Sequence, residues 1–200
     1  MTQLTENQSI QEDQYEFPYH YADLISDRHK YFKSIENLDL QRIVREKVRS
    51  FNKPLILDAG CGDGRLCYEM KNEPFKIIGV DYSERALAFA RAFNPGIEFY
   101  QQDLTKSTLT DKFDVIVLME TLEHFIPDMI PAVIASLSAL LKDDGKLLIT
   151  VPSKNQKLAS KHYQHFDRES LAETVKSHFK VEEIRGYYKM GFNKSWFNFC

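Results

Sequence analysis

Short apolar runs alternate with helical patterns along most of the chain, and this alternation constrains the fold more than any other feature of the sequence. Apolar runs typical of strands cover 55–58, 76–81, 97–103, 113–120, 145–151 and 180–188. Between these runs, apolar residues recur at helical spacing over 65–72, 83–93, 131–141 and 168–179. Strands that alternate with helices pair in parallel through right-handed crossovers. We therefore predict an α/β fold, with a Rossmann-like parallel sheet and helices on both of its faces.

Two segments of different composition precede this region. Residues 1–14 are polar, with few apolar side chains to bury, and we expect this tail to be disordered. Residues 15–53 begin with the aromatic stretch YEFPYHY and continue into a helical pattern over 38–51. We expect them to form an N-terminal lid or packing segment. Residues 54–200 then form the main domain.

The charge and the cysteines narrow the class of protein. A formal net charge of -3 argues against general nucleic-acid binding, which needs a basic face, but it does not rule out a small local basic patch. The chain has no apolar run near the roughly 18 residues of a membrane span, and its first residues lack the pattern of a signal peptide. Its three cysteines have neither metal-site nor disulfide spacing. These features predict a cytoplasmic protein.

A glycine-rich turn, DAGCGDG over 58–64, follows the first predicted strand. Glycines allow a tight turn and let a ligand approach the backbone closely, near amide groups and a helix N-terminus. Asp81 ends the second predicted strand, about 20 residues after the first glycine, where an acid accepts hydrogen bonds from ribose hydroxyls. The spacing is G-x-G-x-G, which differs from the G-x-G-x-x-G of dinucleotide-binding enzymes. The pattern predicts a cofactor that contains a ribose and is not NAD.

Five motifs, in this order, resemble those of class I S-adenosylmethionine-dependent methyltransferases. They are LDAGCGDGRL, VDYSERAL, QQD, FDVIVLMETLEHF and LLKDDGKLLITVPS, and the resemblance covers about residues 54–187. It implies that S-adenosylmethionine is the cofactor, bound by Asp58, Gly60, Cys61, Gly62, Asp81, Tyr82, Asp103, Leu104 and Met119. In this set Tyr82 would flank the adenine ring.

The same resemblance implies roles for the other polar residues. Gly60 and Gly62 would lie under the methionine moiety, and Asp58 would organise the turn or receive the methionine ammonium. Asp81 would bind the ribose hydroxyls, and Asp103 would accept a hydrogen bond from the adenine amino group. Asp103 closes a predicted strand directly after two glutamines. An acid in such a position is also unlikely to lie in an apolar core. The alternative role for Asp103 is a turn cap.

Acidic residues and histidines follow the fourth and fifth predicted strands. Glu120, Glu123 and His124 come after the fourth strand, and His162 and His165 lie just past the fifth. The ends of these two strands are close together in a parallel sheet, so the side chains can converge beside the transferred methyl group. Carboxylates and imidazoles together suit a divalent ion such as Mn, Fe or Zn.

The E-x-x-E-H pattern with a distal histidine resembles two groups of methyltransferases. One comprises the ubiquinone-biosynthesis O-methyltransferases, which act on catechols. The other comprises the small-RNA 3′-terminal 2′-O-methyltransferases, in which four side chains hold a metal against ribose hydroxyls. The resemblance implies a divalent metal (Mg, Mn or Zn) on Glu120, Glu123, His124 and His165. Without a metal, the catalytic residue would be His124 or His165, acting as general base.

Three functions are compatible with these motifs. The leading one is transfer of a methyl group from S-adenosylmethionine to an oxygen or nitrogen of a small-molecule acceptor. The second, RNA 3′-terminal 2′-O-methylation, needs a basic groove, and the net negative charge argues against it. The third is a non-catalytic, cofactor-binding regulatory subunit, and the intact cofactor motifs argue against that.

The C-terminus departs from the class I pattern. These enzymes usually finish with a seventh, antiparallel strand beside the sixth, whereas only residues 189–200 follow the sixth predicted strand here. Three alternatives follow: this tail is a short seventh strand, the chain is truncated, or a partner covers the edge of the sheet.

Overall fold

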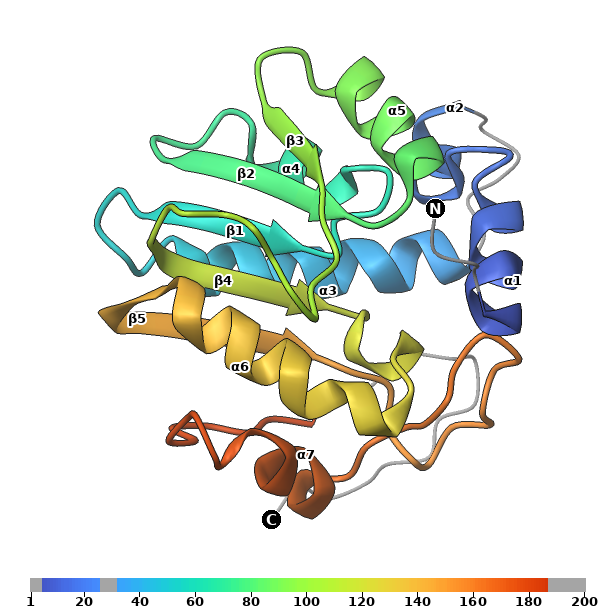
Figure 1. The fold of residues 1–200 in the computed structure, drawn as a ribbon. Coiled ribbons are helices and arrows are strands. Elements are labelled where there is room, and N and C mark those ends of the chain that lie inside the picture. The colour runs from blue at the N-terminus through green and yellow to red at the C-terminus, as the bar shows by residue number, and fades with distance from the viewer. Residues whose placement is uncertain (1–4, 26–31, 187–200) are drawn as a thin grey trace.

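The computed structural model describes residues 5–25 and 32–186. These residues form a five-stranded sheet in which every pairing is parallel. Its strands are β1 Leu55–Ala59, β2 Lys76–Asp81, β3 Glu98–Gln101, β4 Phe113–Met119 and β5 Leu141–Thr150. Their order across the sheet is β3-β2-β1-β4-β5, which confirms the predicted Rossmann-like α/β fold (Figure 1).

The chain changes its direction of travel across the sheet between β1 and β4. From β1 it winds outward to β2 and β3, and it then returns to place β4 on the other side of β1. Asp58 in β1 pairs with Gly79 of β2 on one side and with Val117 of β4 on the other. Because the crossovers leave in opposite directions here, the carboxyl ends of β1 and β4 form the switch point of the sheet. Ligands of such sheets bind in a crevice at this edge, and we refer to the edge by that name.

Helices cover both faces of the sheet. The helices that pack on these faces are α3 Phe32–Val48, α4 Arg65–Met70, α5 Glu84–Phe93, α6 Ile130–Leu140 and α7 Arg168–Val175. Alternate strand residues point to opposite faces: Ile56 and Val115 pack with α3, α4 and α5, whereas Leu57 and Ile116 pack with α6 and α7. Both sets are fully buried, as expected for parallel strands covered on two sides.

Short elements complete the chain near the carboxyl ends of the strands. They are α1 Glu6–Gln14, α2 Ala22–Ile25 and the 3-10 turns η1 Tyr19–Tyr21, η3 Leu122–His124 and η4 Pro127–Met129. Two helix starts are as predicted: the Ser83 hydroxyl caps α5 by accepting a hydrogen bond from the N–H of Ala86, and Pro131 lies in the first turn of α6. Among the described residues, no helix combines the length and the apolar character that a membrane crossing requires.

Most of the tail that was predicted to be disordered is helical. Helix α1 spans Glu6–Gln14, and residues 1–4 lie outside the described part of the chain. The Thr5 hydroxyl accepts a hydrogen bond from the N–H of Gln8, and the Gln8 side chain accepts one from the N–H of Thr5. No residue of α1 is buried, so the helix depends on its cap and on polar contacts. The prediction of disorder counted only apolar residues and does not hold here.

The predicted sixth strand does not form over 180–186, the described part of that segment. Val181 stays 39% exposed, and Glu182 and Glu183 form ion pairs with Lys146 and Lys47. The segment therefore has no apolar face that pairing beside β5 would bury. Residues 187–200, on which the seventh-strand alternatives depend, lie outside the described residues.

Gly64 joins the glycine turn to α4 and packs directly against α5. Its φ is +79°, and a Cβ at this position would lie 2.9 Å from the Cβ of Ala90 and 3.0 Å from its Cα. The side-chain amide of Asn94 donates to the carbonyl oxygen of Gly64 at 3.3 Å. Close packing between turn and helix thus requires glycine here.

We expect Gly64→Ala to destabilise the fold by more than Gly96→Ala. Both residues have positive φ values, +79° and +94°, which cost an alanine about 1–2 kcal/mol. Only Gly64→Ala adds a clash with a helix backbone, because a Cβ on Gly96 would meet nothing within 4 Å. Chemical denaturation of both variants measures the free energy of unfolding. Equal losses would show that the packing of Gly64 against α5 is not required.

Candidate functional site

The glycine turn after β1 lies at the crevice and is fixed by backbone hydrogen bonds. Gly60 and Gly62 have φ values of +77° and +54°, which other residues rarely adopt. The N–H groups of Gly60 and Cys61 donate to the carbonyl oxygen of Val80, at the end of β2, at 2.8 and 2.9 Å. A Cβ on Gly60 would collide with the side chain of Thr121, so glycine lets the turn approach the end of β4.

Asp81 ends β2 and holds the turn from the side. Its carboxylate is buried: Oδ2 accepts a hydrogen bond from the N–H of Gly62 at 2.8 Å, and Oδ1 accepts one from the N–H of Ser83 at 2.9 Å. Burial raises the pKa of Asp81 to about 6, although the backbone hydrogen bonds lower it. Asp81 thus links the glycine turn to the cap of α5, at the position where the sequence predicts a ribose acceptor.

Asp58 lies in β1 directly before the turn and is a second buried acid. Its Oδ2 accepts a hydrogen bond from the thiol of Cys67 at 3.4 Å. Burial raises the pKa of Asp58 to about 7, the bond from Cys67 lowers it, and the charge of Asp81 raises it further. The side chain is 2% exposed, which fits a residue that organises the turn.

Tyr82 and Asp103 lie at the same edge of the sheet. Tyr82 follows Asp81 directly, and Gln101 at the end of β3 pairs with Asp81, so Asp103 comes just beyond that edge. The Asp103 carboxylate accepts hydrogen bonds from the N–H and the hydroxyl of Thr105 at 2.9 and 2.6 Å. This arrangement is the turn cap that the sequence analysis gives as the alternative role of Asp103.

Three further residues of the predicted cofactor set belong to the core at this edge. Cys61 and Leu104 are buried, and Met119, at the end of β4, packs against the core cluster formed with α3, α4 and α5. Leu104 and Met119 therefore contribute apolar packing.

A second group of side chains gathers where β4 and β5 end. Glu123, His124 and His162 each offer one ligand atom, and these atoms lie within 4.8 Å of one another. Glu123 is 1% exposed, and its Oε1 lies 4.0 Å from Nε2 of His124. The N–H of Tyr163 donates to the carbonyl oxygen of Glu123 at 2.9 Å, which fixes the loop that carries His162. One carboxylate and two imidazoles form a donor set for a divalent transition metal.

Two of the ligands predicted from the sequence lie outside this group. Glu120 has a φ of +48°, a costly conformation for a residue with a side chain, and its N–H donates to the carbonyl oxygen of Thr150 at 3.0 Å. His165 is buried, with Nε2 2.9 Å from Nδ1 of His162 and Nδ1 3.3 Å from the carbonyl oxygen of Gln156. It is His162, three residues earlier, that joins Glu123 and His124.

His124 is oriented by a backbone carbonyl group. Its Nδ1 lies 3.2 Å from the carbonyl oxygen of Lys161, which can only accept, so in the neutral ring Nδ1 carries the proton and Nε2 the lone pair. Burial lowers the pKa of His124 to about 3, and the positive charge of Lys161 lowers it further, whereas the contact with the Lys161 carbonyl oxygen raises it. An imidazole with this pKa is a weak general base near neutral pH, whereas its Nε2 lone pair suits a metal.

An aromatic N-terminal segment covers the glycine turn. A Cβ on Gly62 would lie 2.5 Å from the hydroxyl oxygen of Tyr15, so this buried ring comes very close to the turn. In η1, Nδ1 of His20 lies 2.8 Å from Oδ1 of Asp63, and the N–H of His20 donates to Oδ2 at 3.3 Å. The segment that the sequence predicts as a lid therefore lies over the predicted cofactor turn.

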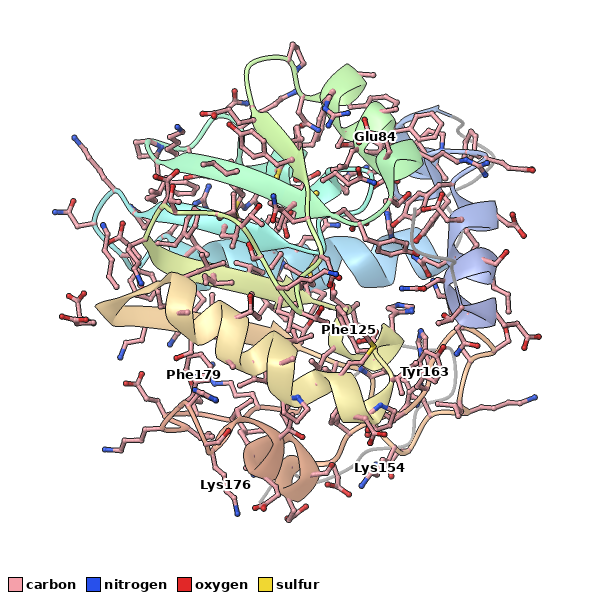
Figure 2. All side chains as sticks on the ribbon, in the orientation of Figure 1. Glu84, Phe125, Lys154, Tyr163, Lys176 and Phe179 are labelled. Carbon is pink, nitrogen blue, oxygen red and sulfur yellow. The ribbon has the colours of Figure 1, made fainter. Side chains whose placement is uncertain are left out.

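Helix α1 stands across the carboxyl ends of the strands (Figure 1). Its contacts with the main domain are Gln8–Tyr82, Glu12–Arg85, Gln14–Lys161 and Thr5–Tyr163, at 3.4, 3.1, 2.8 and 3.0 Å. The first two lie beside the end of β2, and the last two belong to the loop after β5, where Figure 2 shows Tyr163 next to the end of α1. The T-x-x-Q capping box at Thr5 is the sequence signal that could have revealed this helix.

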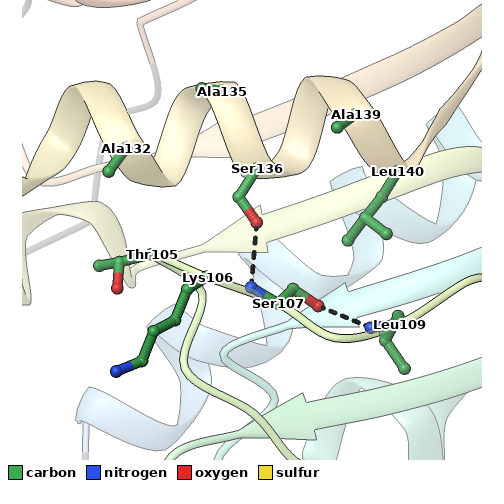
Figure 3. A pocket seen from close by; sticks show the side chains of 9 residues that line it. All are labelled: Thr105, Lys106, Ser107, Leu109, Ala132, Ala135, Ser136, Ala139 and Leu140. Carbon is green, nitrogen blue, oxygen red and sulfur yellow. Dashed lines mark hydrogen bonds between the residues drawn. The ribbon is translucent and has the colours of Figure 1, made fainter.

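A separate pocket of about 450 Å³ lies between the β3–β4 loop and α6 (Figure 3). Small residues of α6 form one wall, and the N–H of Ser107 donates to the hydroxyl of Ser136 at 3.4 Å. The lining contains no residue of the glycine turn or of the group around Glu123. This pocket is therefore not part of the crevice.

The arrangement at the crevice defines the class of the protein. A doubly wound sheet whose second strand ends in an acid bound to a G-x-G-x-G turn is the architecture of class I S-adenosylmethionine-dependent methyltransferases. The chain belongs to the methyltransferase family: the family model described as "Methyltransferase domain" matches residues 28–187.

Individual relatives agree with this assignment. The ubiquinone biosynthesis O-methyltransferase of Aeromonas salmonicida is 31% identical over 135 residues, which cover 63% of this chain and 56% of that protein. The one of Haemophilus ducreyi is 33% identical over 138 residues, covering 63% and 58%. The chain spans about half the length of the curated relatives it matches. The structure of magnesium protoporphyrin IX methyltransferase from Synechocystis, with bound S-adenosylmethionine, has a TM-score of 0.66 at 20% identity and covers 89% of this chain and 88% of its own.

Asp58→Asn is expected to gain stability relative to the natural protein as the pH rises from 5 to 8. In the folded protein the pKa of Asp58 is about 7, against an ordinary 3.8. The stability that the protonated form contributes is therefore present at low pH and lost as the pH rises through about 7. The substituted amide stays neutral and avoids this loss. Melting temperatures of both proteins across this range measure the difference.

Asp114→Asn is the control, because a hydrogen bond from Lys142 lowers the pKa of Asp114. This variant should lose stability at pH 8 rather than gain it. If Asp58→Asn and the natural protein show the same pH dependence, Asp58 does not hold a proton in the folded state.

Proposed function

We propose that this chain transfers a methyl group from S-adenosylmethionine to an oxygen or nitrogen atom of a small-molecule acceptor. The observation that carries the proposal is that the glycine turn and the Glu123 group follow the adjacent parallel strands β1 and β4, at the switch point of the sheet. Methyl transfer is an in-line displacement, so donor and acceptor must be held face to face while the acceptor loses its proton. The names of the O-methyltransferase relatives support an oxygen acceptor.

On the cofactor side, we assign each polar residue one role. Gly60 and Gly62 would lie under the methionine moiety, which could approach the glycine backbone of the turn closely. Asp81 would accept hydrogen bonds from the ribose hydroxyls, because two N–H donors already orient its carboxylate. Tyr82 would flank the adenine ring, and Asp103 would accept from its amino group.

We assign the N-terminal segment, residues 5–21, to a cover that closes over the bound cofactor. Support comes from the position of Tyr15 over Gly62 and from the anchoring of His20 to Asp63. A cover of this kind excludes water and strengthens the electrostatic interactions beneath it. We place the reaction in the cytoplasm, which the free thiols of Cys61 and Cys67 support.

On the acceptor side, we propose that Glu123, His124 and His162 are the ligands of a divalent metal. Two imidazoles and a carboxylate are donors for Zn, Mn or Fe, whereas Mg prefers oxygen donors. Such an ion, when bound, would hold an acceptor hydroxyl and lower its pKa. An acceptor with two neighbouring hydroxyls, such as a catechol, fits this role.

Two observations weigh against the alternative in which His124 or His165 is the general base. The pKa of His124 is lowered by burial to about 3, so it takes up a proton poorly at neutral pH. Both ring nitrogens of His165 face other groups of the chain, His162 and the carbonyl oxygen of Gln156.

Asp81→Ala is expected to weaken S-adenosylmethionine binding by more than about tenfold. A hydrogen bond to a charged group contributes about 1.5–3 kcal/mol, and the N–H of Gly62 also loses its acceptor. Calorimetry with S-adenosylmethionine and with its demethylated product measures the affinity. Ser83→Ala is the control, because it removes the cap of Ala86 but keeps the carboxylate. A loss below about threefold in Asp81→Ala, or tight binding of NAD, would contradict the assignment.

The metal assignment predicts that the chain retains about one divalent ion after equilibration with Zn²⁺ or Mn²⁺ and removal of the excess. Glu123→Gln and His162→Ala should each lose it, because each removes one of three donors. His178→Ala, at an exposed position beyond α7, is the control. Elemental analysis measures the bound ion. Methyl transfer that survives thorough chelation would contradict the metal and leave the methyltransferase proposal intact.

A further inference from the structure

Two histidines in the loop between β5 and α7 form a hydrogen-bonded pair. Nδ1 of His162 lies 2.9 Å from Nε2 of His165, and Nδ1 of His165 lies 3.3 Å from the carbonyl oxygen of Gln156. His165 is 8% exposed, and the two ring centroids are 5.1 Å apart. A chain of contacts therefore runs from the loop backbone, through His165, to the group around Glu123.

These contacts determine which nitrogen of His162 carries its proton. A carbonyl oxygen only accepts, so Nδ1 of His165 must donate to Gln156. In neutral His165 the other nitrogen, Nε2, then accepts, and its donor is Nδ1 of His162. His162 consequently has its proton on Nδ1 and its lone pair on Nε2.

His124 has the same tautomer, with its proton on Nδ1, because that nitrogen faces the carbonyl oxygen of Lys161. The rings of His124 and His162 are nearly perpendicular, at 89°, with centroids 4.7 Å apart. Both basic nitrogens are thus Nε2 atoms, and one loop orients both rings. The N–H of Tyr163 ties that loop to the carbonyl oxygen of Glu123.

We propose that His165 is a positioning residue: it fixes His162 in the tautomer whose Nε2 can bind a divalent ion together with Glu123 and His124. This inference rests on the metal role proposed above. His165 itself does not touch the ion. A hydrogen bond to the second nitrogen of a ligating histidine sets its tautomer and ring orientation, and losing such a bond typically weakens metal binding about 10–100-fold.

Two substitutions separate the hydrogen bond from the bulk of the ring. In His165→Gln, the side-chain oxygen can still accept from His162, and the amide nitrogen can still donate to the carbonyl oxygen of Gln156. In His165→Leu, both interactions are lost. His178→Leu, at an exposed position, controls for the loss of a histidine as such.

Two measurements on the whole chain test the proposal. Nitrogen-15 NMR of the metal-free protein at one fixed pH shows which nitrogen of His162 is protonated, and titration with Co²⁺, followed by visible absorption, gives the metal affinity. We expect an Nδ1 proton in the natural protein, His165→Gln and His178→Leu, and mixed tautomers in His165→Leu. Co²⁺ affinity should fall about 10–100-fold in His165→Leu and less than about threefold in the other two variants.

An Nε2 proton on His162 in the natural protein would overturn the proposal, whether or not a metal binds. Unchanged Co²⁺ affinity in His165→Leu would overturn it as well. If the natural protein binds no Co²⁺ but loses the Nδ1 tautomer in His165→Leu, the positioning role is supported and the proposed metal function is contradicted. The NMR measurement on the natural protein does not depend on the folding of any variant.

Discussion

The buried carboxylate of Asp81 is the contact on which the geometry of the crevice depends. It accepts hydrogen bonds from Gly62 in the turn after β1 and from Ser83 at the start of α5. One carboxylate group thus joins the β1–β2 connection to the β2–β3 connection. This is possible because β1 and β2 are adjacent and parallel, with their carboxyl ends at the same edge. A carboxylate kept from water is unfavourable without such donors. A ligand that offers hydroxyl groups would add further donors to the same oxygens.

The end of β4 completes the crevice from the other side of β1. Thr121 packs so closely on Gly60 that no side chain fits between them, and the neighbouring Glu120 adopts a φ of +48°. The backbone therefore turns sharply as it leaves the strand, and η3 directs Glu123 and His124 toward the loop after β5. Strain held at a strand end in this way is common at functional sites, where the surrounding structure fixes it.

The apolar pattern predicted β1, β2 and β4 well, because these strands are buried on both faces and their burial leaves a continuous signal. β2 has the predicted bounds, 76–81, and the glycine turn and Asp81 lie where the motif spacing puts them. Helix α1 and the segment 180–186 escaped prediction because polar contacts, not apolar burial, decide their conformation. Whether His162 or His165 lies beside Glu123 and His124 depends on the side-chain rotamers of two residues in one loop. The sequence spacing of the two histidines does not contain this information.

Helix α1 has consequences for the rate at which molecules enter and leave the crevice. It buries no residue of its own and is attached by hydrogen bonds to Tyr82 and Arg85 on one side and to Lys161 and Tyr163 on the other. Each such bond contributes only about 0.5–1.5 kcal/mol, because water can replace it. A segment held in this way detaches by local opening while the sheet stays intact. Because one helix binds both sides, a single opening event would release its contacts beside the end of β2 and in the loop after β5 together. The buried ring of Tyr15 lies over Gly62 and would also have to move before the glycine turn is exposed. The residence time of anything bound beneath the segment would therefore depend on that ring as well as on the hydrogen bonds of α1.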